Sequence, residues 1–457
     1  MSATTIQHSK KHPPGLYLLF FTEMWERFSY YGMRGILVLY LTSELFAGGL
    51  GMSATTAMSI YGFYTGAVYI TPLIGGWLSD MYLGKRLAIT IGGISMALGN
   101  FFIFLQQEKW ALFVGMALLI IGNGFFKPNI SSLVGDLYDT TDPKRDAAFT
   151  IFYMGINIGA FLAPLVIALI TDKIMGGMTP EGMVYGYKWG FLASSIGMII
   201  GQVLFNLLGN KYLGDLGKKP TGRVVTDKGE TDKRPLTKKE KERTAVILIL
   251  ACFVVFFWAG FEQAGSSLTL YTRDFVDRTI FGFEIPTAWF QSVNPLFIVL
   301  LAPVVSALWV KLGRSKRGDF SSPTKMAIGM ILLGTGFLIL LIAILRTGND
   351  ASAVVNKAHI IFIVLTYLFH TLGELFLSPV GLSTVTRLAP LKLASLLMGV
   401  WLASSGVANI LAGQLASVTQ SLGYFEVFAV IGGLAIALGL ILLAFSKKLT
   451  QMMHLED

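Results

Sequence analysis

Long apolar stretches alternate along the chain with short polar connections. Each stretch reaches about 20 residues, the length that an α-helix needs to cross the hydrocarbon core of a bilayer. We therefore predict an all-α membrane protein with twelve transmembrane helices. The predicted spans lie near residues 15–44, 54–79, 86–105, 109–137, 146–170, 187–209, 243–271, 285–310, 324–345, 358–387, 394–419 and 423–446.

The first span carries a polar face within membrane-grade apolar sequence. At about 100° per residue, Glu23, Glu26, Arg27, Tyr30 and Arg34 fall close to one line along this helix. A charge at bilayer depth costs about 2.5–3.5 kcal/mol on insertion scales, so such charges are typical of functional positions. The pattern predicts that the first helix lines a water-filled path.

One long polar connection divides the predicted spans into two sets of six. It covers residues 210–242 and is rich in lysine and arginine. We predict an N-terminal bundle at 1–209, a linker at 210–242 and a C-terminal bundle at 243–457. A solvated tether is the simpler interpretation of the linker, and a surface for a partner or for anionic lipids is the alternative.

Composition and charge agree with a membrane protein. Of the 457 residues, 54% are hydrophobic and only 14% are charged, and the mean hydropathy is +0.64. The net charge of +9 does not indicate nucleic-acid binding, because the basic residues concentrate in connections on one side of the predicted membrane. This positive-inside pattern places both termini in the cytoplasm.

Signals of metal binding and of catalysis are missing from the sequence. Cys252 is the single cysteine, and the five histidines are spread from position 8 to position 454. No nucleotide-binding or nucleophile-elbow motif is present. We expect neither an enzyme nor a metal or other cofactor.

The connection between the second and third spans suggests a fold. Residues 75–86, Gly-Gly-Trp-Leu-Ser-Asp-Met-Tyr-Leu-Gly-Lys-Arg, resemble the cytoplasmic loop of the major facilitator superfamily, with one extra residue between Asp80 and Gly84. The resemblance implies the major facilitator fold, with a substrate site between two six-helix bundles near the membrane midplane. An acid followed by paired bases would latch helix ends in one conformation.

Five segments together resemble the proton-coupled oligopeptide transporter family. The first, residues 23–34, contains the Glu-x-x-Glu-Arg signature, and the others follow in family order at 75–86, 152–159, 257–267 and 373–382. Many bacterial members have two more helices between spans six and seven. Residues 210–242 are too polar to supply them, so inferences that need fourteen helices do not carry over.

A short peptide is a zwitterion, and its capture requires cations and an anion at opposite ends of a cavity. The spans supply Arg34 and Lys127 as cations, Glu374 as an anion, and Asn157 and Asn294 as amides. The resemblance implies that the two cations receive the peptide carboxylate and that Glu374 receives its amino group. It further implies a substrate-contacting set of Tyr30, Tyr69, Asn157 and Asn294 along the backbone, with Trp289 and Trp401 walling the side-chain pockets.

Proton coupling requires a carboxylate whose proton affinity changes when a neighbouring cation changes partner. Arg27 adjoins Glu26 and lies four residues after Glu23, so we predict these three as the proton site, with a static salt bridge as the alternative. Four further residues are predicted to form gating pairs, Arg34 with Glu262 and Lys127 with Glu374. His370 lies one turn before Glu374, where packing is the simpler interpretation and proton relay the alternative.

These features predict a proton-coupled symporter that imports di- and tripeptides by alternating access. It would be a monomer in a bacterial inner membrane and would contact peptides, protons and the lipid bilayer. One alternative is a transporter of nitrate or another small anion, which Glu374 disfavours. The other is a peptide sensor that does not transport and signals through the 210–242 segment.

Overall fold

The computed structural model describes residues 12–139, 142, 144–220, 235–315, 318–349, 354, 356–390 and 393–454. Each of the twelve predicted spans has a helical counterpart in these ranges. Residues 221–234 of the predicted linker lie outside them. The N-terminal helices are α1 (Pro14–Thr42), α2 (Ala54–Leu78), α3 (Lys85–Leu105), α4 (Lys109–Asp136), α5 (Arg145–Ala168) and α6 (Tyr187–Leu213).

The second half of the chain repeats this organisation with more interruptions. One predicted span, 243–271, is broken in the structure into α7, the 3₁₀ turn η3 and α8. The helices are α7 (Lys238–Phe261), η3 (Glu262–Gly265), α8 (Ser267–Phe275), η4 (Thr287–Ser292), α9 (Val293–Gly313), α10 (Ser322–Thr347), α11 (Ile360–Leu388), α12 (Ala394–Ser417), α13 (Thr419–Leu422) and α14 (Tyr424–Met453).

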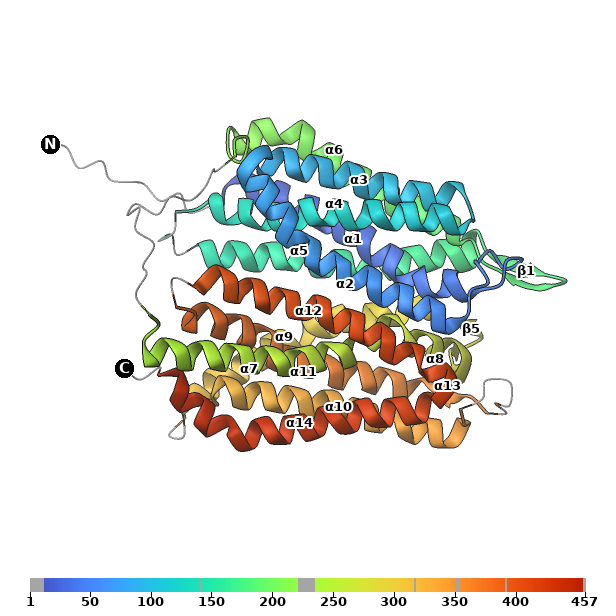
Figure 1. Cartoon of the computed structure of the whole chain (residues 1–457). Coiled ribbons are helices and arrows are strands. Elements are labelled where there is room, and N and C mark those ends of the chain that lie inside the picture. Colours follow the sequence, from blue (N-terminus) through green and yellow to red (C-terminus); the bar gives the residue numbers. More distant parts are fainter. Residues whose placement is uncertain are drawn as a thin grey trace.

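The helices form two bundles whose axes run in similar directions (Figure 1). α1 begins and α14 ends at one end of the molecule, which we call the chain-end side. Short strands cluster at the opposite end, the hairpin side: β1 (Gly177–Thr179) pairs with β2 (Gly182–Val184), β4 (Thr279–Ile280) with β5 (Phe283–Glu284), and β3 (Val276–Asp277) with β6 (Ala358–His359).

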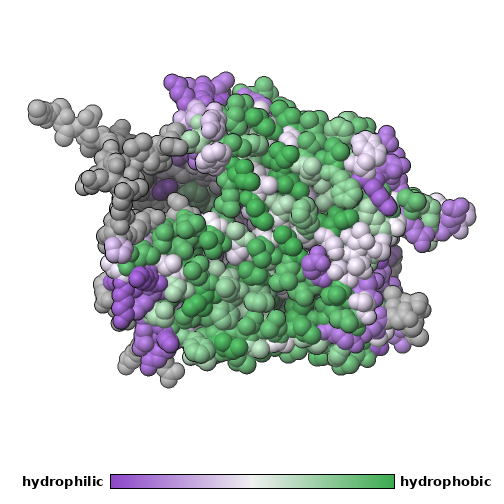
Figure 2. All heavy atoms as spheres, in the orientation of Figure 1, coloured by the Kyte–Doolittle hydropathy of each residue, from purple (hydrophilic) through white to green (hydrophobic). Residues whose placement is uncertain are grey.

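Ten helices within the described residues are long and apolar enough to cross a membrane. Apolar side chains cover the middle of the face drawn in Figure 2, and hydrophilic residues gather towards its two ends. A belt of this kind matches a bilayer, where apolar chains meet the outer surface of the protein. The chain is therefore a multi-pass membrane protein, as the hydropathy pattern predicted.

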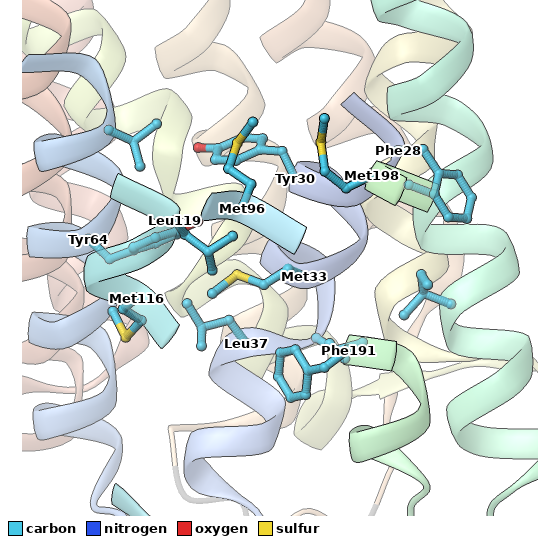
Figure 3. Packing of buried hydrophobic residues seen from close by; sticks show 14 of the residues in the cluster. Phe28, Tyr30, Met33, Leu37, Tyr64, Met96, Met116, Leu119, Phe191 and Met198 are labelled. Carbon is cyan, nitrogen blue, oxygen red and sulfur yellow. The ribbon is translucent and has the colours of Figure 1, made fainter. Parts of the chain in front are cut away.

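Each bundle has its own apolar core. In the N-terminal bundle, side chains of α1, α2, α3, α4 and α6 meet around the middle of α1 (Figure 3). The labelled members of this core are Phe28, Tyr30, Met33, Leu37, Tyr64, Met96, Met116, Leu119, Phe191 and Met198.

The segment from residue 75 to residue 86 ties helix ends together within the N-terminal bundle. A short π-helical turn, η1 (Ser79–Leu83), follows α2, and Gly84 then has a φ of +78°, which favours glycine. Lys85 Nζ lies 2.5 Å from Asp136 Oδ2 at the end of α4. The first basic residue of the pair thus joins α3 to α4, and a latch function for this segment stays a prediction.

Helices α2 and α12 make a close contact between the two bundles. A Cβ added to Gly62 would lie 2.5 Å from the Cα of Gly413, and one added to Gly66 would lie 2.8 Å from the carbonyl oxygen of Gly406. Small residues allow such backbone approach in membranes. The two bundles therefore meet backbone to backbone along this seam.

We expect Gly62→Leu to force this seam apart, because the added side chain has only the backbone of α12 in front of it. The expected loss is about 1–3 kcal/mol, the usual range for overpacking. The midpoint of thermal unfolding in detergent measures it. Gly433→Leu is the matched control, since a Cβ at Gly433 meets nothing within 4 Å; equal midpoints for the two variants would contradict the prediction.

Candidate functional site

A cavity of about 300 Å³ lies between the bundles, at the lower end of the range for ligand pockets. Helices α1, α2, α4 and α5 line one side, and α7, η3, η4, α9 and α11 line the other. Six charged side chains from both bundles reach it within the membrane-spanning region. They are Glu23, Arg27, Arg34, Lys127, Glu262 and Glu374.

The acidic pair of α1 shares one arginine. Arg27 Nε lies 3.2 Å from Glu23 Oε1 and also contacts Glu26 Oε2. Asn123 of α4 donates a hydrogen bond of 3.4 Å to the other oxygen of Glu26. Glu23 and Glu26 are only 1% and 0% exposed, so neither carboxylate has bulk water as an alternative partner.

Two atoms of this cluster lack a hydrogen-bond partner among the described residues, Glu23 Oε2 and Arg27 Nη2. Both residues line the cavity, whereas Glu26 lies behind them, towards α4. A buried polar atom without a partner costs about 1–3 kcal/mol, unless a water, a proton or a ligand satisfies it. The cavity side of the cluster therefore has a free acceptor and a free donor among the described residues.

A second buried charge pair crosses from one bundle to the other. Arg34 Nη2 of α1 contacts Glu262 Oε2 of η3, and Arg34 Nε donates a hydrogen bond of 2.6 Å to the Tyr61 hydroxyl. The ring of Tyr31 lies 5.7 Å from the same guanidinium. The predicted pairing of Arg34 with Glu262 is therefore present in the structure, while its role as a gate stays a prediction.

More contacts between the bundles surround this pair on the hairpin side. Gln291 donates to the carbonyl of Gly35 at 3.3 Å, and Ser292 donates to the carbonyl of Phe161 at 2.7 Å. Arg273 donates to the Thr42 hydroxyl at 3.0 Å. The bundles are therefore joined on the hairpin side. On the chain-end side, the face in Figure 2 is hollowed between them.

The second predicted gating pair is not formed. No ion pair between described residues joins Lys127 to Glu374; instead Lys127 Nζ lies 4.5 Å from the centre of the Tyr69 ring. Glu374 Oε2 accepts a hydrogen bond of 2.9 Å from Asn294, which also donates to Thr371. In this conformation the two bundles are joined through Arg34 and Glu262 and not through Lys127 and Glu374.

Three residues assigned to substrate contact from the resemblance lie outside the cavity lining. The Tyr30 hydroxyl is buried without a partner in the described part of the chain, in the core of Figure 3. Trp289 donates to the Leu165 carbonyl at 3.1 Å and lines a separate apolar groove. Trp401 is 7% exposed and packs against Gly381.

Helix geometry places Tyr30 at the edge of the cavity-facing side of α1. Measured from Arg27 at about 100° per residue, Glu23 lies near −40°, Arg34 near −20° and Tyr31 near +40°. Tyr30 lies near −60°, about 20° beyond Glu23, and its side chain packs in the core of the N-terminal bundle (Figure 3). The (i, i+4) series 23, 27, 31 in the sequence therefore carried the signal for Tyr31, which lines the cavity and which the sequence analysis missed.

The remaining predicted substrate residues, Tyr69, Lys127, Asn157, Asn294 and Glu374, all line the cavity. His370 lines it too, and its ring packs 4.7 Å from that of Phe337. Its role, in packing or in proton relay, stays a prediction. Further lining residues that the sequence analysis did not single out are Tyr31, Tyr153, Trp258, Phe261, Gln291 and Tyr367.

A sequence profile of the POT family matches residues 86–227 and 229–431. The chain is 35% identical to the peptide transporter YePEPT of Yersinia enterocolitica, over 88% of this chain and 87% of the relative. It is 31% identical to the di-/tripeptide transporter of Lactococcus lactis subsp. cremoris, over 96% of both chains. It is 37% identical to the uncharacterized transporter YclF of Bacillus subtilis, over 97% of this chain and 95% of the relative.

Solved structures with a similar fold cover nearly the whole chain. A crystal structure of a mutant peptide transporter POT in complex with alafosfalin has a TM-score of 0.86 and 36% identity, and the match covers 97% of this chain and 96% of that one. A POT family transporter in complex with 5-aminolevulinic acid also has a TM-score of 0.86, with 32% identity over 96% and 97% of the two chains.

Proposed function

The chain belongs to the POT family of transporters, and from this premise we propose that it is a proton-coupled symporter of di- and tripeptides. Relatives named as peptide transporters support the substrate class. The observation that carries the proposal is the charge arrangement of the cavity. Arg34 and Lys127 enter it from the N-terminal bundle and Glu374 from the C-terminal bundle.

A bound peptide would match this arrangement group by group. Its carboxylate would lie with Arg34 and Lys127, and its amino group with Glu374 and Asn294, where the amide already holds one oxygen of Glu374. Asn157 and Tyr69 line the space between. Such charge-assisted hydrogen bonds fix a zwitterion at both ends. The side chains of the peptide would then contact cavity walls that accept different shapes. An anion transporter has no use for Glu374.

The proton would bind at the cluster of Glu23, Glu26 and Arg27. Arg27 contacts two carboxylates. A proton bound to one carboxylate would leave Arg27 paired with the other carboxylate alone. Glu23 and Arg27 line the same cavity as the substrate residues. This change of partner would therefore alter the electrostatic potential where the peptide binds. Alternating access would follow if the pair of Arg34 and Glu262 opened as the chain-end side closed.

Uptake into proteoliposomes tests the proposal. Labelled dialanine is expected to accumulate under an inward proton gradient, and Glu26→Gln is expected to abolish accumulation while counterflow of dialanine persists. Glu44→Gln is the control that is expected to keep both activities, because Glu44 is exposed and follows the end of α1 on the hairpin side. Driven uptake in Glu26→Gln would refute the role of Glu26. Peptide binding without counterflow would indicate a sensor, and competition by nitrate an anion transporter.

The remaining expectations concern the setting of the protein. We place both termini in the cytoplasm, because the basic connections of the sequence lie on the chain-end side. We also expect a monomer in a bacterial inner membrane, where the bacterial origin of the similar transporters supports the type of membrane. The hairpin side would then face outwards, and import would run from the closed end of this conformation to the hollowed one.

A further inference from the structure

A second cavity, of about 420 Å³, lies on the outer surface of the N-terminal bundle between α3 and α6. These two helices pack side by side along one edge of the molecule (Figure 1). The cavity shares no lining residue with the one between the bundles. Its walls are mainly apolar and reach the protein surface through Ile94, Leu98, Phe101, Ile199 and Val203.

Polar side chains continue this groove towards the chain-end side. Arg86 donates to Asn210 Oδ1 at 3.0 Å and to the Gly214 carbonyl at 2.9 Å. One turn deeper, Thr90 donates to Asn206 Oδ1 at 3.0 Å, and Gln202 donates to the same oxygen at 3.0 Å. From the chain-end side inwards, the groove therefore presents the cation Arg86, then the amides of Asn206 and Gln202, and then apolar walls.

Asn206 is exposed and lines the groove. Its Oδ1 accepts two hydrogen bonds, whereas its Nδ2 has no hydrogen-bond partner in the described part of the chain. α6 ends at Leu213, seven residues later, so the amide lies about 10 Å inside the helix end. An amide at this depth requires an acceptor, because bare hydrocarbon would leave it unsatisfied.

We propose that the groove between α3 and α6 binds one anionic glycerophospholipid from the leaflet on the chain-end side. The phosphate would lie with Arg86 and with Lys211, the basic residue in the last turn of α6. An ester carbonyl would accept from Asn206 Nδ2, and an acyl chain would fill the apolar groove. Arg86 and Phe101 are fifteen residues apart on α3, about 22 Å, which accommodates an acyl chain beneath a headgroup.

The order of groups along the groove selects this ligand over other occupants. Phosphate, ester and acyl chain follow one another in this order in a phospholipid, and the cations Arg86 and Lys211 favour one with a net negative charge. Asp215 is the acidic residue near Arg86, and it is already paired with Lys218 at 2.9 Å. The inference does not rest on the proposed transport function, since no groove residue lines the central cavity.

Native mass spectrometry of the purified full-length protein tests this site, with phosphatidylglycerol as the probe. We expect one phosphatidylglycerol to remain bound when the detergent removes other lipids, and phosphatidylcholine or palmitate to be retained at least about fivefold less. Ile94→Trp, which fills the groove without touching the polar residues, is expected to lower the bound fraction at least about fivefold, as is Asn206→Leu.

Ile342→Trp on α10 is the matched control, because Ile342 and Ile94 are both 49% exposed. Equal retention in Ile94→Trp and Ile342→Trp would overturn the proposal and identify the lipid as annular. Equal retention of phosphatidylcholine would overturn the anionic assignment, and a dimer lost in Ile94→Trp would identify a protein interface instead. If Asn206→Leu unfolds, Ile94→Trp decides alone, since it leaves the hydrogen bonds of Asn206 intact.

Discussion

Replacing Arg27 with leucine is expected to destabilise the folded protein by about 3–5 kcal/mol, the usual penalty when one partner of a buried ion pair is removed. The reason is the geometry around this residue. Glu23 and Glu26 are 1% and 0% exposed, and Arg27 is the cation in contact with both. Without it, two buried carboxylates lose the cation that they share.

The thermal unfolding midpoint in detergent measures this effect, and its pH dependence identifies the cause. Acid can protonate a carboxylate that has lost its cation, so the deficit of Arg27→Leu relative to the wild type should shrink as the pH falls. Arg27→Lys should lie between the two, because lysine retains the charge but not the planar fork of the guanidinium.

Arg346→Leu is the matched control, since Arg346 is exposed at the end of α10 and an exposed charge contributes about 1 kcal/mol or less. A deficit of Arg27→Leu no larger than that of Arg346→Leu would show that Arg27 is not the counterion of two ionised carboxylates. A deficit that stayed constant with pH would point to lost packing instead.

The helices were predictable from the sequence because the hydrophobic periodicity and length of a span are local properties. Spans predicted at 54–79 and 109–137 correspond to α2 at 54–78 and α4 at 109–136. The break after Phe261 was missed, although residues 262–267, Glu-Gln-Ala-Gly-Ser-Ser, interrupt the apolar sequence there. Tertiary contacts hold these polar side chains: Glu262 contacts Arg34, and Gln263 donates to the Ala412 carbonyl on α12.

The cavity lining was predictable at charged residues, because charged side chains are rare within membrane-spanning helices. Glu23, Arg27, Arg34, Lys127, Glu262 and Glu374 all reach the cavity, because a charged side chain in a bilayer must find an aqueous or charged neighbour. Aromatic residues carry no such constraint. Tyr30, Trp289 and Trp401 pack elsewhere, since an aromatic ring is equally stable in a core, and only the fold decides which.

Lys127 and Glu374 form no ion pair in the described structure. We attribute this to the conformation that the structure represents, because the sequence supplies both charges. Under the alternating access that we propose, two gating pairs would not close both ends at once, and here the pair of Arg34 and Glu262 is the one that is formed. A sequence specifies both pairs and therefore cannot indicate which is formed.

Glu262→Ala is expected to open the hairpin side. Arg34 is 9% exposed and keeps only the Tyr61 hydroxyl and the neighbouring aromatic rings as partners in this variant. A buried charge that has lost its counterion is satisfied most readily by water, and water reaches it when the bundles separate there. A loss of about 1.4 kcal/mol from the closed state already shifts the ratio of closed to open tenfold, and a buried pair is expected to exceed that.

Cysteine accessibility measures this shift. Cys252 is the only cysteine, so Cys252→Ser provides the background, and Asn157→Cys places a thiol in the cavity. A membrane-impermeant thiol reagent added from the hairpin side should label this thiol at least about tenfold faster when Glu262→Ala is also present. Glu284→Ala, which removes the 60% exposed carboxylate of the Arg278–Glu284 pair of 2.6 Å at the same end, should leave the rate unchanged, because that pair does not join the two bundles.

A double-mutant cycle separates the charge pair from general loosening of that end. If Arg34 and Glu262 act through each other, Arg34→Gln combined with Glu262→Gln should label more slowly than the sum of the single effects predicts, because no unpaired charge remains buried. Strictly additive effects would mean that each residue stabilises the closed end through other contacts. The pair would then be a consequence of closure on the hairpin side and not its cause.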